Sequence, residues 1–417
     1  MNTIERILLD HSTEKIKTVE PGDFVNVNLD LVILLDIAGT HTEFTNNYPL
    51  KPFNKDKLYL VFDHFSPAGS VEIANSVDKI RKLGTIWDIK NIYSYGDGGI
   101  SHALGRERGW FKPGMIIGNT DSHSIAAGSF NCLSRGLGTP EIMNAISTGT
   151  TWYQVGETVY VNMEGEARPP IEGKDIFLYL ASILGSIPGN NIEFEGSGIK
   201  TLPLEERAVI ATMCAELSAE FAIFPFDNIL KYHLDNLKIE GYKPYYPDPD
   251  YRYKNTIDIN LYDIKPMIAL PDKIVGNIRL VEDVSGREIT EAVVGSCSNG
   301  KLSDLAIAAQ MLHNRKISKD VKFIVTPATT RIYLQALKLG YIEKIINAGG
   351  IVTNPTCGVC FGGNMGVAGK NDIVITSTTR NFKGRMGDSN AKIYLSSTAT
   401  VVASAIHGYI STPERDL

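Results

Sequence analysis

The stretch Glu291-Ala292-Val293-Val294-Gly295 runs directly into Ser296 and Cys297, so an apolar, β-branched segment ends on a small polar residue and a thiol. Three other segments have the same form: residues 58–62 precede Asp63 and His64, residues 115–118 precede Asp121, Ser122 and His123, and residues 372–376 precede Arg380. Short apolar runs of this kind predict strands that are buried on both faces, as in parallel sheets. Ligands of α/β proteins bind at the carboxyl ends of such strands, which is where these polar side chains fall.

Helical apolar spacing between the strands, at residues 305–312 and 332–339, completes the alternation expected of an α/β protein. Arg168-Pro169-Pro170 follows the strand-like residues 159–163 and marks one boundary. Residues 241–254 are rich in Tyr, Pro and Asp, cannot continue a helix, and predict a linker. We therefore expect three α/β domains, at residues 1–168, at residues 169–285 with the linker 241–254, and at residues 286–417 with Cys297, Cys357 and Cys360.

The chain has 417 residues, of which 43% are hydrophobic and 21% charged, values typical of globular proteins rather than disordered or fibrous ones. A formal net charge of −6 offers no basic excess for nucleic acid or for an anionic membrane surface. No segment reaches the ~18 apolar residues needed to span a bilayer, and the N-terminus lacks the pattern of a signal peptide. We therefore expect a soluble cytoplasmic protein that binds neither nucleic acid nor membrane.

The cysteines number five, an odd and small count that argues against a disulfide framework. Cys357 and Cys360 form a C-x-x-C motif, which alone is compatible with a thioredoxin-type redox pair, a structural zinc site or an iron–sulfur cluster. The preceding residues are unlike those of redox pairs, and no fourth zinc ligand is evident. Cys297 could also be one buried thiol among others, the interpretation that we give to Cys132 and Cys214. The loop at residues 295–300 upstream favours the cluster.

Five motifs, in the same order and spacing, resemble those of the aconitase superfamily. They are Asp63-His64-Phe65, Thr120-Asp121-Ser122-His123-Ser124, Gly295-Ser296-Cys297-Ser298-Asn299-Gly300, Cys357-Gly358-Val359-Cys360 followed by Gly362-Gly363, and Arg380-Asn381-Phe382-Lys383-Gly384-Arg385. The resemblance covers about residues 5–410 and extends to the large-subunit families of 3-isopropylmalate dehydratase and homoaconitase, which divide an aconitase between two chains. It implies three domains of α/β/α layers around a central cluster cleft, without the swivelling small domain.

The resemblance also implies a cofactor and a set of residue roles. A [4Fe–4S] cluster would be held by Cys297, Cys357 and Cys360, with one iron open to act as a Lewis acid. Arg380 and Arg385 would bind substrate carboxylates through their planar guanidinium groups. Carboxylate–imidazole pairs would supply a proton to the departing hydroxide. The implied catalytic residues are Asp63, His64, His102, Asp121, Ser122, His123 and Glu216. The base for the C–H proton would be a serine of a separate small subunit, in a heterodimer or heterotetramer.

The implied function is that of the large subunit of an iron–sulfur hydro-lyase that is active only with its small subunit. Its reaction would dehydrate and rehydrate a 2-hydroxycarboxylate such as 3-isopropylmalate, in leucine biosynthesis. Thr212 and Thr379 stand where the family usually has asparagine, and residues 36–42 form an unusual early loop. These departures from the family pattern bear on the identity of the substrate more than on the cluster. The alternatives are a homoaconitase or 2,3-dimethylmalate dehydratase large subunit, with a cluster-free RNA-binding protein or a zinc-stabilised scaffold as rivals of another class.

Overall fold

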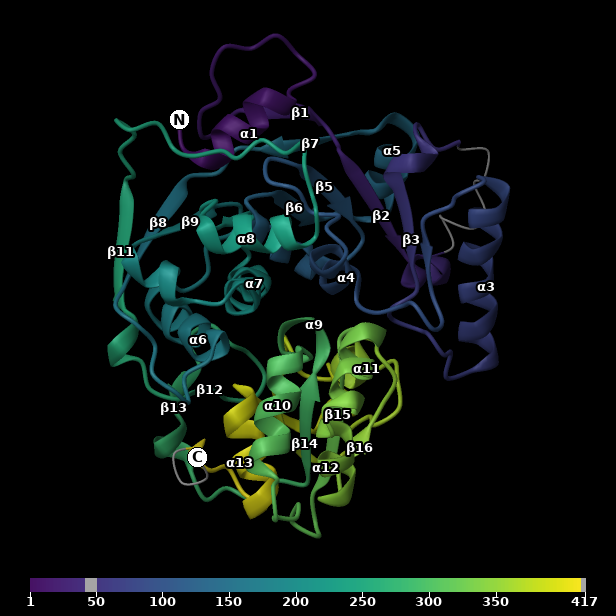
Figure 1. The fold of residues 1–417 in the computed structure, drawn as a ribbon, viewed down its shortest axis with the longest axis vertical. Helices are drawn as coiled ribbons and strands as arrows, with labels where there is room; N and C mark the ends of the chain where they lie inside the picture. Colours follow the sequence, from purple (N-terminus) through teal and green to yellow (C-terminus); the bar gives the residue numbers. More distant parts are fainter. Residues whose placement is uncertain (42–50, 414–417) are drawn as a thin grey trace. The chain divides into compact units, whose positions relative to one another are not determined.

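The computed structural model describes residues 1–41 and 51–413, which form two compact units (Figure 1). Unit 1 contains Met1–Ser94, Ser101–Glu166 and Ile187–Asn260, whereas unit 2 contains Tyr95–Ile100, Ala167–Ser186 and the chain from Leu261 onward. The short segment Tyr95–Ile100 belongs to unit 2 because the Ile100 amide donates a hydrogen bond of 2.9 Å to the carbonyl of Ala328. Each unit is therefore assembled from stretches that are not continuous in sequence.

Unit 1 is built on two parallel sheets and one antiparallel pair. The five-stranded sheet has the order β4-β3-β2-β5-β6, formed by Leu31–Leu35 (β2), Leu58–Val61 (β3), Ile92–Tyr93 (β4), Ile116–Asn119 (β5) and Leu133–Gly136 (β6). The four-stranded sheet has the order β10-β9-β8-β11, formed by Thr158–Glu164 (β8), Asn191–Glu195 (β9), Ala222–Ile223 (β10) and Asn255–Asn260 (β11). Phe24–Asn28 (β1) pairs antiparallel with Thr150–Gln154 (β7).

The core of unit 1 covers the five-stranded sheet. Every residue of β2 is buried, and Leu31, Ile33 and Leu35 share a cluster with Phe111 and Phe130. The helices of this unit are Thr3–His11 (α1), Val71–Ile86 (α3), Ser101–Glu107 (α4), Thr139–Thr148 (α5), Leu204–Met213 (α7) and Asn228–Asn236 (α8). Burial of β2 on both faces is the reason that its sequence is continuously apolar rather than alternating.

Unit 2 is built on one seven-stranded sheet of order β13-β12-β18-β17-β14-β15-β16. Its strands are Met267–Ala269 (β12), Ile278–Leu280 (β13), Glu291–Gly295 (β14), Lys322–Thr326 (β15), Ile351–Val352 (β16), Ile373–Thr376 (β17) and Lys392–Ser396 (β18). All pairs from β18 to β16 are parallel, and β12 is antiparallel to both of its neighbours. The helices are Gly173–Leu184 (α6), Ser296–Asn299 (α9), Leu302–Met311 (α10), Thr330–Lys338 (α11), Tyr341–Asn347 (α12) and Thr398–His407 (α13).

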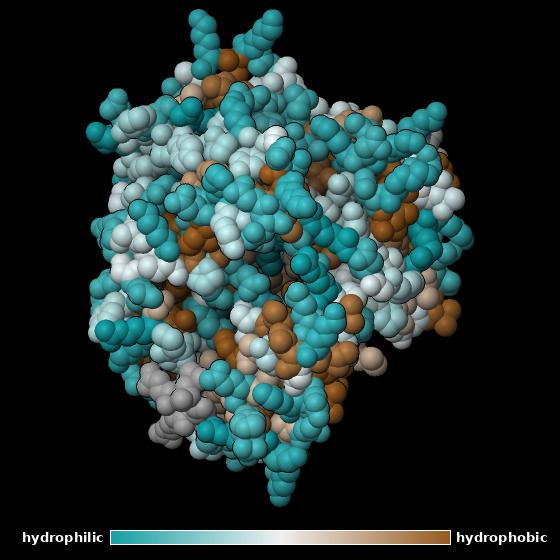
Figure 2. Space-filling view, viewed as in Figure 1, coloured by the Kyte–Doolittle hydropathy of each residue, from teal (hydrophilic) through white to brown (hydrophobic). Residues whose placement is uncertain are grey.

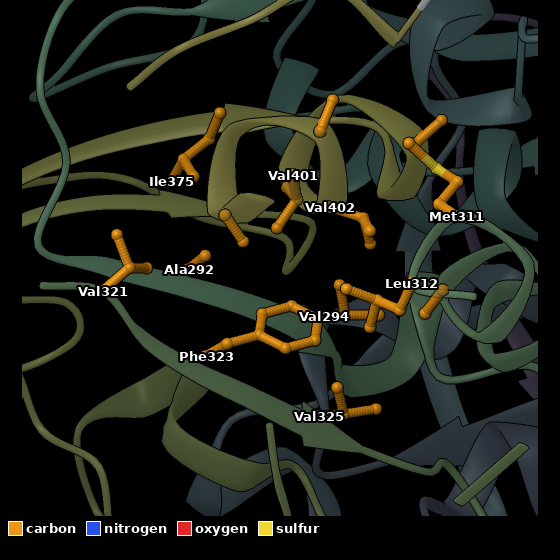
Figure 3. Packing of buried hydrophobic residues seen from close by; sticks show 14 of the residues in the cluster. Ala292, Val294, Met311, Leu312, Val321, Phe323, Val325, Ile375, Val401 and Val402 are labelled. Atoms are coloured by element: carbon orange, nitrogen blue, oxygen red, sulfur yellow. The ribbon is translucent and has the colours of Figure 1, made fainter. Parts of the chain in front are cut away.

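The two faces of the unit 2 sheet carry separate cores. Ala292 and Val294 of β14 lie in one cluster with Phe323 of β15 and Val402 of α13, as Figure 3 shows. Val293, between them in sequence, lies in a second cluster on the opposite face. This alternation follows from the two-residue period of a strand, which sends successive side chains to opposite faces.

The structure confirms the α/β class and the predicted strands at the site-bearing segments, which are β3, β5, β14 and β17. The two predicted helical stretches correspond to α10 and α11. Residues 241–254 contain neither helix nor strand, and they lie within unit 1, where the Tyr245 amide donates to Asn131 Oδ1 at 2.9 Å. The division into domains at residues 168 and 285 stays a prediction. Thr42, in the unusual early loop, and residues 414–417 lie outside the described residues.

The surface is mixed in character. Figure 2 shows a viewed face in which hydrophilic residues dominate and hydrophobic ones are interspersed. Among the exposed large hydrophobic residues are Leu334 and Leu337 of α11 and Ile346 of α12. Within residues 1–41 and 51–413, no helix combines the length and the apolar character needed to cross a bilayer.

Candidate active site

Three neighbouring strands of unit 2 end at the same edge of the sheet, because β17, β14 and β15 are adjacent and parallel. Gly295 closes β14 opposite Thr326 of β15. On the other side of β14, the Ser377 amide that follows β17 donates to the carbonyl of Val293 at 2.9 Å. Segments that leave these three strands therefore begin close together.

Cys297 follows the central strand, β14, through a tight turn. Gly295 has a φ of +149° and Ser296 a φ of +66°, which is uncommon for a residue with a side chain. A Cβ on Gly295 would lie 2.6 Å from the Thr326 carbonyl oxygen, so only glycine fits this approach of the two backbones. The turn leads into the short helix α9 and leaves Cys297 only 5% exposed.

The C-x-x-C segment lies over the same sheet edge. Cys357 is the N-cap of a short 3-10 helix, Gly358–Phe361, whose Val359 is buried in the second core cluster with Val293 and Ile324. Gly358 has a φ of +59°, and a Cβ there would lie 2.7 Å from Thr326 Oγ1 at the end of β15. The motif is thus held by a buried valine and by a glycine pressed against a strand end.

Cys360 reaches the end of the third strand. Its Sγ lies 3.5 Å from Oγ1 of Thr379, in the segment that follows β17. The C-x-x-C segment therefore lies against the last residue of β15 and contacts a residue that follows β17. These are the two strands that flank β14 and its Cys297. This arrangement brings the three predicted ligand residues to one edge of one sheet.

The donor chemistry at this edge fits an iron–sulfur cluster. All three thiols are buried and none forms a disulfide, whereas the remaining cysteines, Cys132 and Cys214, lie in unit 1. Burial raises the pKa of both unit 1 thiols, and Cys214 donates to the Ile210 carbonyl within its own helix. Three soft sulfur donors, supplied by a C-x-x-C turn and one distant loop, are of the kind that binds such clusters.

Arg385 lies beside this edge, in the loop between β17 and β18. Its Nη2 is 3.7 Å from Cys360 Sγ, and its guanidinium carbon lies 5.6 Å from the centre of the Phe382 ring. Arg380 is half-buried in the same loop. A guanidinium next to a buried thiol offers both charge compensation and a planar fork for a carboxylate.

Lys174 of α6 is a buried group at this edge that the sequence motifs do not reveal. Its Nζ donates to Ser298 Oγ at 2.9 Å, to the Ser377 carbonyl at 3.0 Å and to the Thr378 carbonyl at 2.7 Å. Burial lowers the pKa of Lys174 to about 7, against the opposing effect of the Cys297 thiol. Gly173-Lys174-Asp175 has no distinguishing pattern, so sequence gave no signal for this contact.

Asp63 and His64 form the first carboxylate–imidazole pair of unit 1, directly after β3. His64 Nδ1 lies 2.7 Å from Asp63 Oδ1, and the other carboxylate oxygen accepts the Ser101 amide at 2.8 Å. Burial alone would lower the pKa of His64, but the adjacent Asp63 carboxylate, with Asp121 and Asp36, raises it to about 9. The imidazole is therefore held in its protonated, proton-donating form at neutral pH.

Asp36, the first residue of the unusual early loop, is a second group to which the sequence motifs assign no role. It is fully buried at the end of β2 and accepts the amides of His64 at 3.1 Å and Phe65 at 2.8 Å. Burial, reinforced by the neighbouring Asp63 carboxylate, raises the pKa of Asp36 to about 6. A carboxylate directly after a fully buried strand is the signal that could have identified it, because Asp63 follows β3 in the same way.

Asp121, His123 and Glu216 form a second group in unit 1. Asp121 caps the 3-10 helix Ser122–Phe130 by accepting the His123 amide at 2.6 Å, and it lies 3.8 Å from His64 Nε2. His123 Nε2 lies 2.8 Å from Glu216 Oε1, on the short helix Cys214–Leu217. Although burial opposes ionisation, the hydrogen bond from His123 and the nearby imidazoles hold the pKa of Asp121 well below its usual value.

His102 of α4 has a different environment from the other two histidines. It is completely buried, and neither ring nitrogen has a hydrogen-bond partner among the described residues. Burial lowers the pKa of His102 to about 3, because the opposing charge of Asp121 does not offset the loss of solvent. His102 is thus a neutral imidazole with donor and acceptor capacity unused.

Two further predicted residues contribute less to these groups. The Ser122 side chain is exposed, next to Asp121. Thr212, where the family usually has asparagine, donates its hydroxyl to the Ala208 carbonyl of its own helix at 2.6 Å. Thr379, the other departure, does contact a predicted ligand, Cys360. Thr379 therefore has a polar contact with a predicted ligand, whereas the hydroxyl of Thr212 is bonded to the backbone of its own helix.

The fold and the two groups of side chains define a parallel α/β protein with a buried three-thiol site and carboxylate-paired histidines. The family profile described as "Aconitase family (aconitate hydratase)" matches residues 72–287 and 277–408. The chain belongs to the aconitase family.

Relatives with assigned names cover nearly the whole chain. A 3-isopropylmalate dehydratase large subunit from Mycolicibacterium smegmatis is 40% identical over 99% of this chain and 96% of its own length. Proteins of the same name from Caldanaerobacter subterraneus subsp. tengcongensis and Clostridium kluyveri are 38% and 37% identical, over 95% and 99% of this chain and 96% and 99% of their own lengths. The crystal structure of aconitase X from Thermococcus kodakaraensis has a TM-score of 0.53 at 14% identity, covering 88% of each chain, which supports the fold.

Proposed function

We propose that this chain is the large subunit of an iron–sulfur hydro-lyase that isomerises a 2-hydroxycarboxylate, with 3-isopropylmalate as the substrate to test first. The proposal rests mainly on one observation: Cys297, Cys357 and Cys360 lie at the same edge of one sheet, and Arg385 lies beside Cys360. Relatives named 3-isopropylmalate dehydratase large subunit, at up to 40% identity and nearly full length, support the choice of substrate.

The three cysteines would hold a [4Fe–4S] cluster, whose open iron supplies Lewis-acid assistance to the departure of a hydroxyl group. Arg385 and Arg380 would bind carboxylates of the substrate and fix its orientation. Bidentate pairing would leave little freedom for the bound carboxylate, which favours elimination from one conformer. Arg385 is the better supported of the two, because its guanidinium already lies beside Cys360.

Proton transfer would come from the histidines that are paired with carboxylates. Elimination removes a proton from carbon and hydroxide from the neighbouring carbon, so one water is released and one C=C bond forms. His64, kept protonated by Asp63, would give a proton to the departing hydroxide and take it back in the reverse addition. Asp121 and Glu216 would orient His64 and His123, and neutral His102 would offer an unused ring nitrogen to the substrate.

The proposal includes a small subunit. The relatives are named large subunits, and a separate small subunit would supply the serine base for the C–H proton. A heterodimer or heterotetramer would then be the active species. Without this partner, the chain is expected to bind the cluster but to turn over substrate poorly.

The test is an anaerobic reconstitution with iron and sulfide, followed by an assay with a candidate small subunit. Isopropylmalate, homocitrate, 2,3-dimethylmalate and citramalate would be compared by kcat/KM. We expect brown protein from sulfur-to-iron charge transfer and the highest kcat/KM for isopropylmalate. Colourless protein after reconstitution would reject the cluster, whereas brown protein that prefers another acid would reject only the substrate.

A further inference from the structure

Lys174 is the feature of unit 2 that the family motifs leave unexplained. It is fully buried near the start of α6, and the cost of burying an ammonium requires strong compensation. Its Nζ has three oxygen acceptors, which are Ser298 Oγ, the Ser377 carbonyl and the Thr378 carbonyl. This lysine is therefore held in one position rather than reaching toward solvent.

The hydrogen-bond pattern defines the charge of this side chain. Ser298 Oγ lies 3.1 Å from the Ser377 carbonyl and donates its hydrogen to it, so the serine oxygen is an acceptor toward Lys174. The other two partners are carbonyls, which only accept. Three acceptors require three N–H donors, and only the protonated ammonium has three.

The acceptors belong to the two loops that carry the sulfur site. Ser298 directly follows Cys297, while Ser377 and Thr378 directly precede Thr379, which contacts Cys360. Lys174 thus ties the segment after β14 to the segment after β17. All three acceptors are neutral. The negative charges that favour the ammonium form of Lys174 are those of Cys297, Cys360 and Asp304, in that order.

The neighbouring buried lysine shows the contrast. Lys301 lies 3.0 Å from Asp304 Oδ2 and so is paired with a carboxylate of its own helix region. Lys174 instead places its charge among neutral oxygens beside the cysteine loops. A buried cation in such a place compensates negative charge that thiolates and a bound cluster would bring.

We infer that Lys174 is a positioning residue for the iron–sulfur cluster, which locks the two loops together and supplies a buried positive charge that raises the reduction potential of the cluster. This inference rests on the proposed function, because it requires a cluster at Cys297, Cys357 and Cys360. Adding an electron to a cluster is favoured by a nearby cation and by hydrogen bonds at the surrounding loops. Removing the cation should therefore make reduction harder.

The experiment compares three variants of the full-length chain after anaerobic reconstitution. Lys174→Met removes the charge and the donors, Ser298→Ala removes one acceptor but keeps the charge, and Lys316→Met removes an exposed lysine as a control. The readouts are iron and sulfide content and the midpoint potential of the cluster, followed by electron paramagnetic resonance. Neither readout depends on turnover.

We expect Lys174→Met to shift the midpoint to more negative potential or to lose the cluster, with Ser298→Ala closer to wild type and Lys316→Met unchanged. An unchanged potential in a fully loaded Lys174→Met protein would overturn the inference. If Lys174→Met does not fold by circular dichroism, Lys174→Gln, which keeps two N–H donors, replaces it under the same criterion. A wild-type chain that takes up no cluster would instead reject the proposed function, so the two failures are distinguishable.

Discussion

His123 Nε2 lies 2.8 Å from Oε1 of Glu216, although 93 residues separate the two in the chain. His123 is the second residue of the 3-10 helix after β5, and Glu216 lies on the short helix that follows α7. The imidazole is thus held between two carboxylates, since its Nδ1 lies 3.5 Å from Asp121. The two contacts fix the orientation of the His123 ring.

Glu216→Gln should lower kcat by about 10- to 100-fold while KM changes little, because the amide keeps the size of the side chain but not the charge that orients His123. Steady-state kinetics of the reconstituted two-subunit enzyme would measure this. Glu205→Gln, an exposed position on α7, is the matched control and should behave as wild type. Equal kinetics for both variants would contradict the role of Glu216.

Asp63→Asn should move the alkaline limb of the kcat/KM profile to lower pH. Burial lowers the pKa of His64, and the Asp63 carboxylate is the largest of the effects that raise it to about 9. The neutral amide of asparagine should therefore let this pKa fall. The limb reports deprotonation of the acid that assists hydroxide departure. A limb at the same pH in both proteins would assign the acid to another group.

The same variant has a stability signature of defined sign. Because the folded-state pKa of His64 lies above its ordinary value of 6.5, its contribution to the free energy of unfolding is complete below pH 6.5 and is lost as pH rises through about 9. Wild-type protein should therefore lose stability more steeply than Asp63→Asn between these pH values. Urea midpoints of both proteins would be measured across that interval. If the Asp63–His64 pair does not exist, the midpoints of the two proteins should change with pH to the same extent.

Lowering the pH should destabilise the protein through His102, with the opposite sign. The pKa of His102 is about 3, below its ordinary value of 6.5, because the buried ring resists protonation. Its contribution is complete above pH 6.5 and is lost as pH falls toward 3, since the unfolded chain binds the proton first. His102→Leu should flatten this part of the curve, and exposed His313→Gln should not.

Cys357→Ser should abolish retention of the cluster and reduce activity by at least ~100-fold, because the hydroxyl is a poor substitute for a thiolate ligand. The fold should remain, because Cys357 is not itself a member of the hydrophobic clusters of either unit. Iron content and visible absorbance give the first readout and circular dichroism the second. Cys214→Ser, which removes a buried thiol of unit 1, is the control and should leave the cluster content unchanged. Loss of the cluster in both variants would point to a general effect of thiol removal.

Arg385→Lys should cost about 2 kcal/mol of transition-state binding, roughly 30-fold in kcat/KM, because the planar fork for a carboxylate is lost while the charge remains. Arg331→Lys on α11 is an exposed control. Kinetics that do not distinguish Arg385→Lys from this control would show that Arg385 does not bind the substrate.

Much of the architecture was predictable from local sequence. The apolar runs before Asp63, Asp121 and Cys297 are strands β3, β5 and β14, because continuous apolar segments bounded by glycine and polar residues form strands only where both faces are buried. The linker interpretation of residues 241–254 predicted their lack of regular structure. It could not show that Tyr245 returns to Asn131, because that contact joins residues 114 positions apart.

The candidate site was predictable where a motif is continuous in sequence and not where a contact is made across the fold. The adjacent pair Asp63–His64 and the C-x-x-C segment could be named from the chain alone. Lys174 could not, because its partner Ser298 lies 124 residues away. Asp36 stands after an apolar run and could have been noticed, but its partner His64, 28 residues away, is known only from the fold. Ser122 shows the converse, since a motif residue proves to be exposed.

By itself, the sequence determined the α/β class and the positions of the strands that bear the candidate site, because these depend on the local hydrophobic pattern. It also proposed Cys297, Cys357 and Cys360 as sulfur ligands, because their motifs resemble those of a known family. Only the tertiary structure decided which strand ends are neighbours. The order β17-β14-β15 puts Cys297 between the segments that Cys360 and Gly358 touch, and this order depends on long-range pairing that no local pattern specifies. The same packing buries Lys174 and His102, and burial is the physical cause of their altered pKa values.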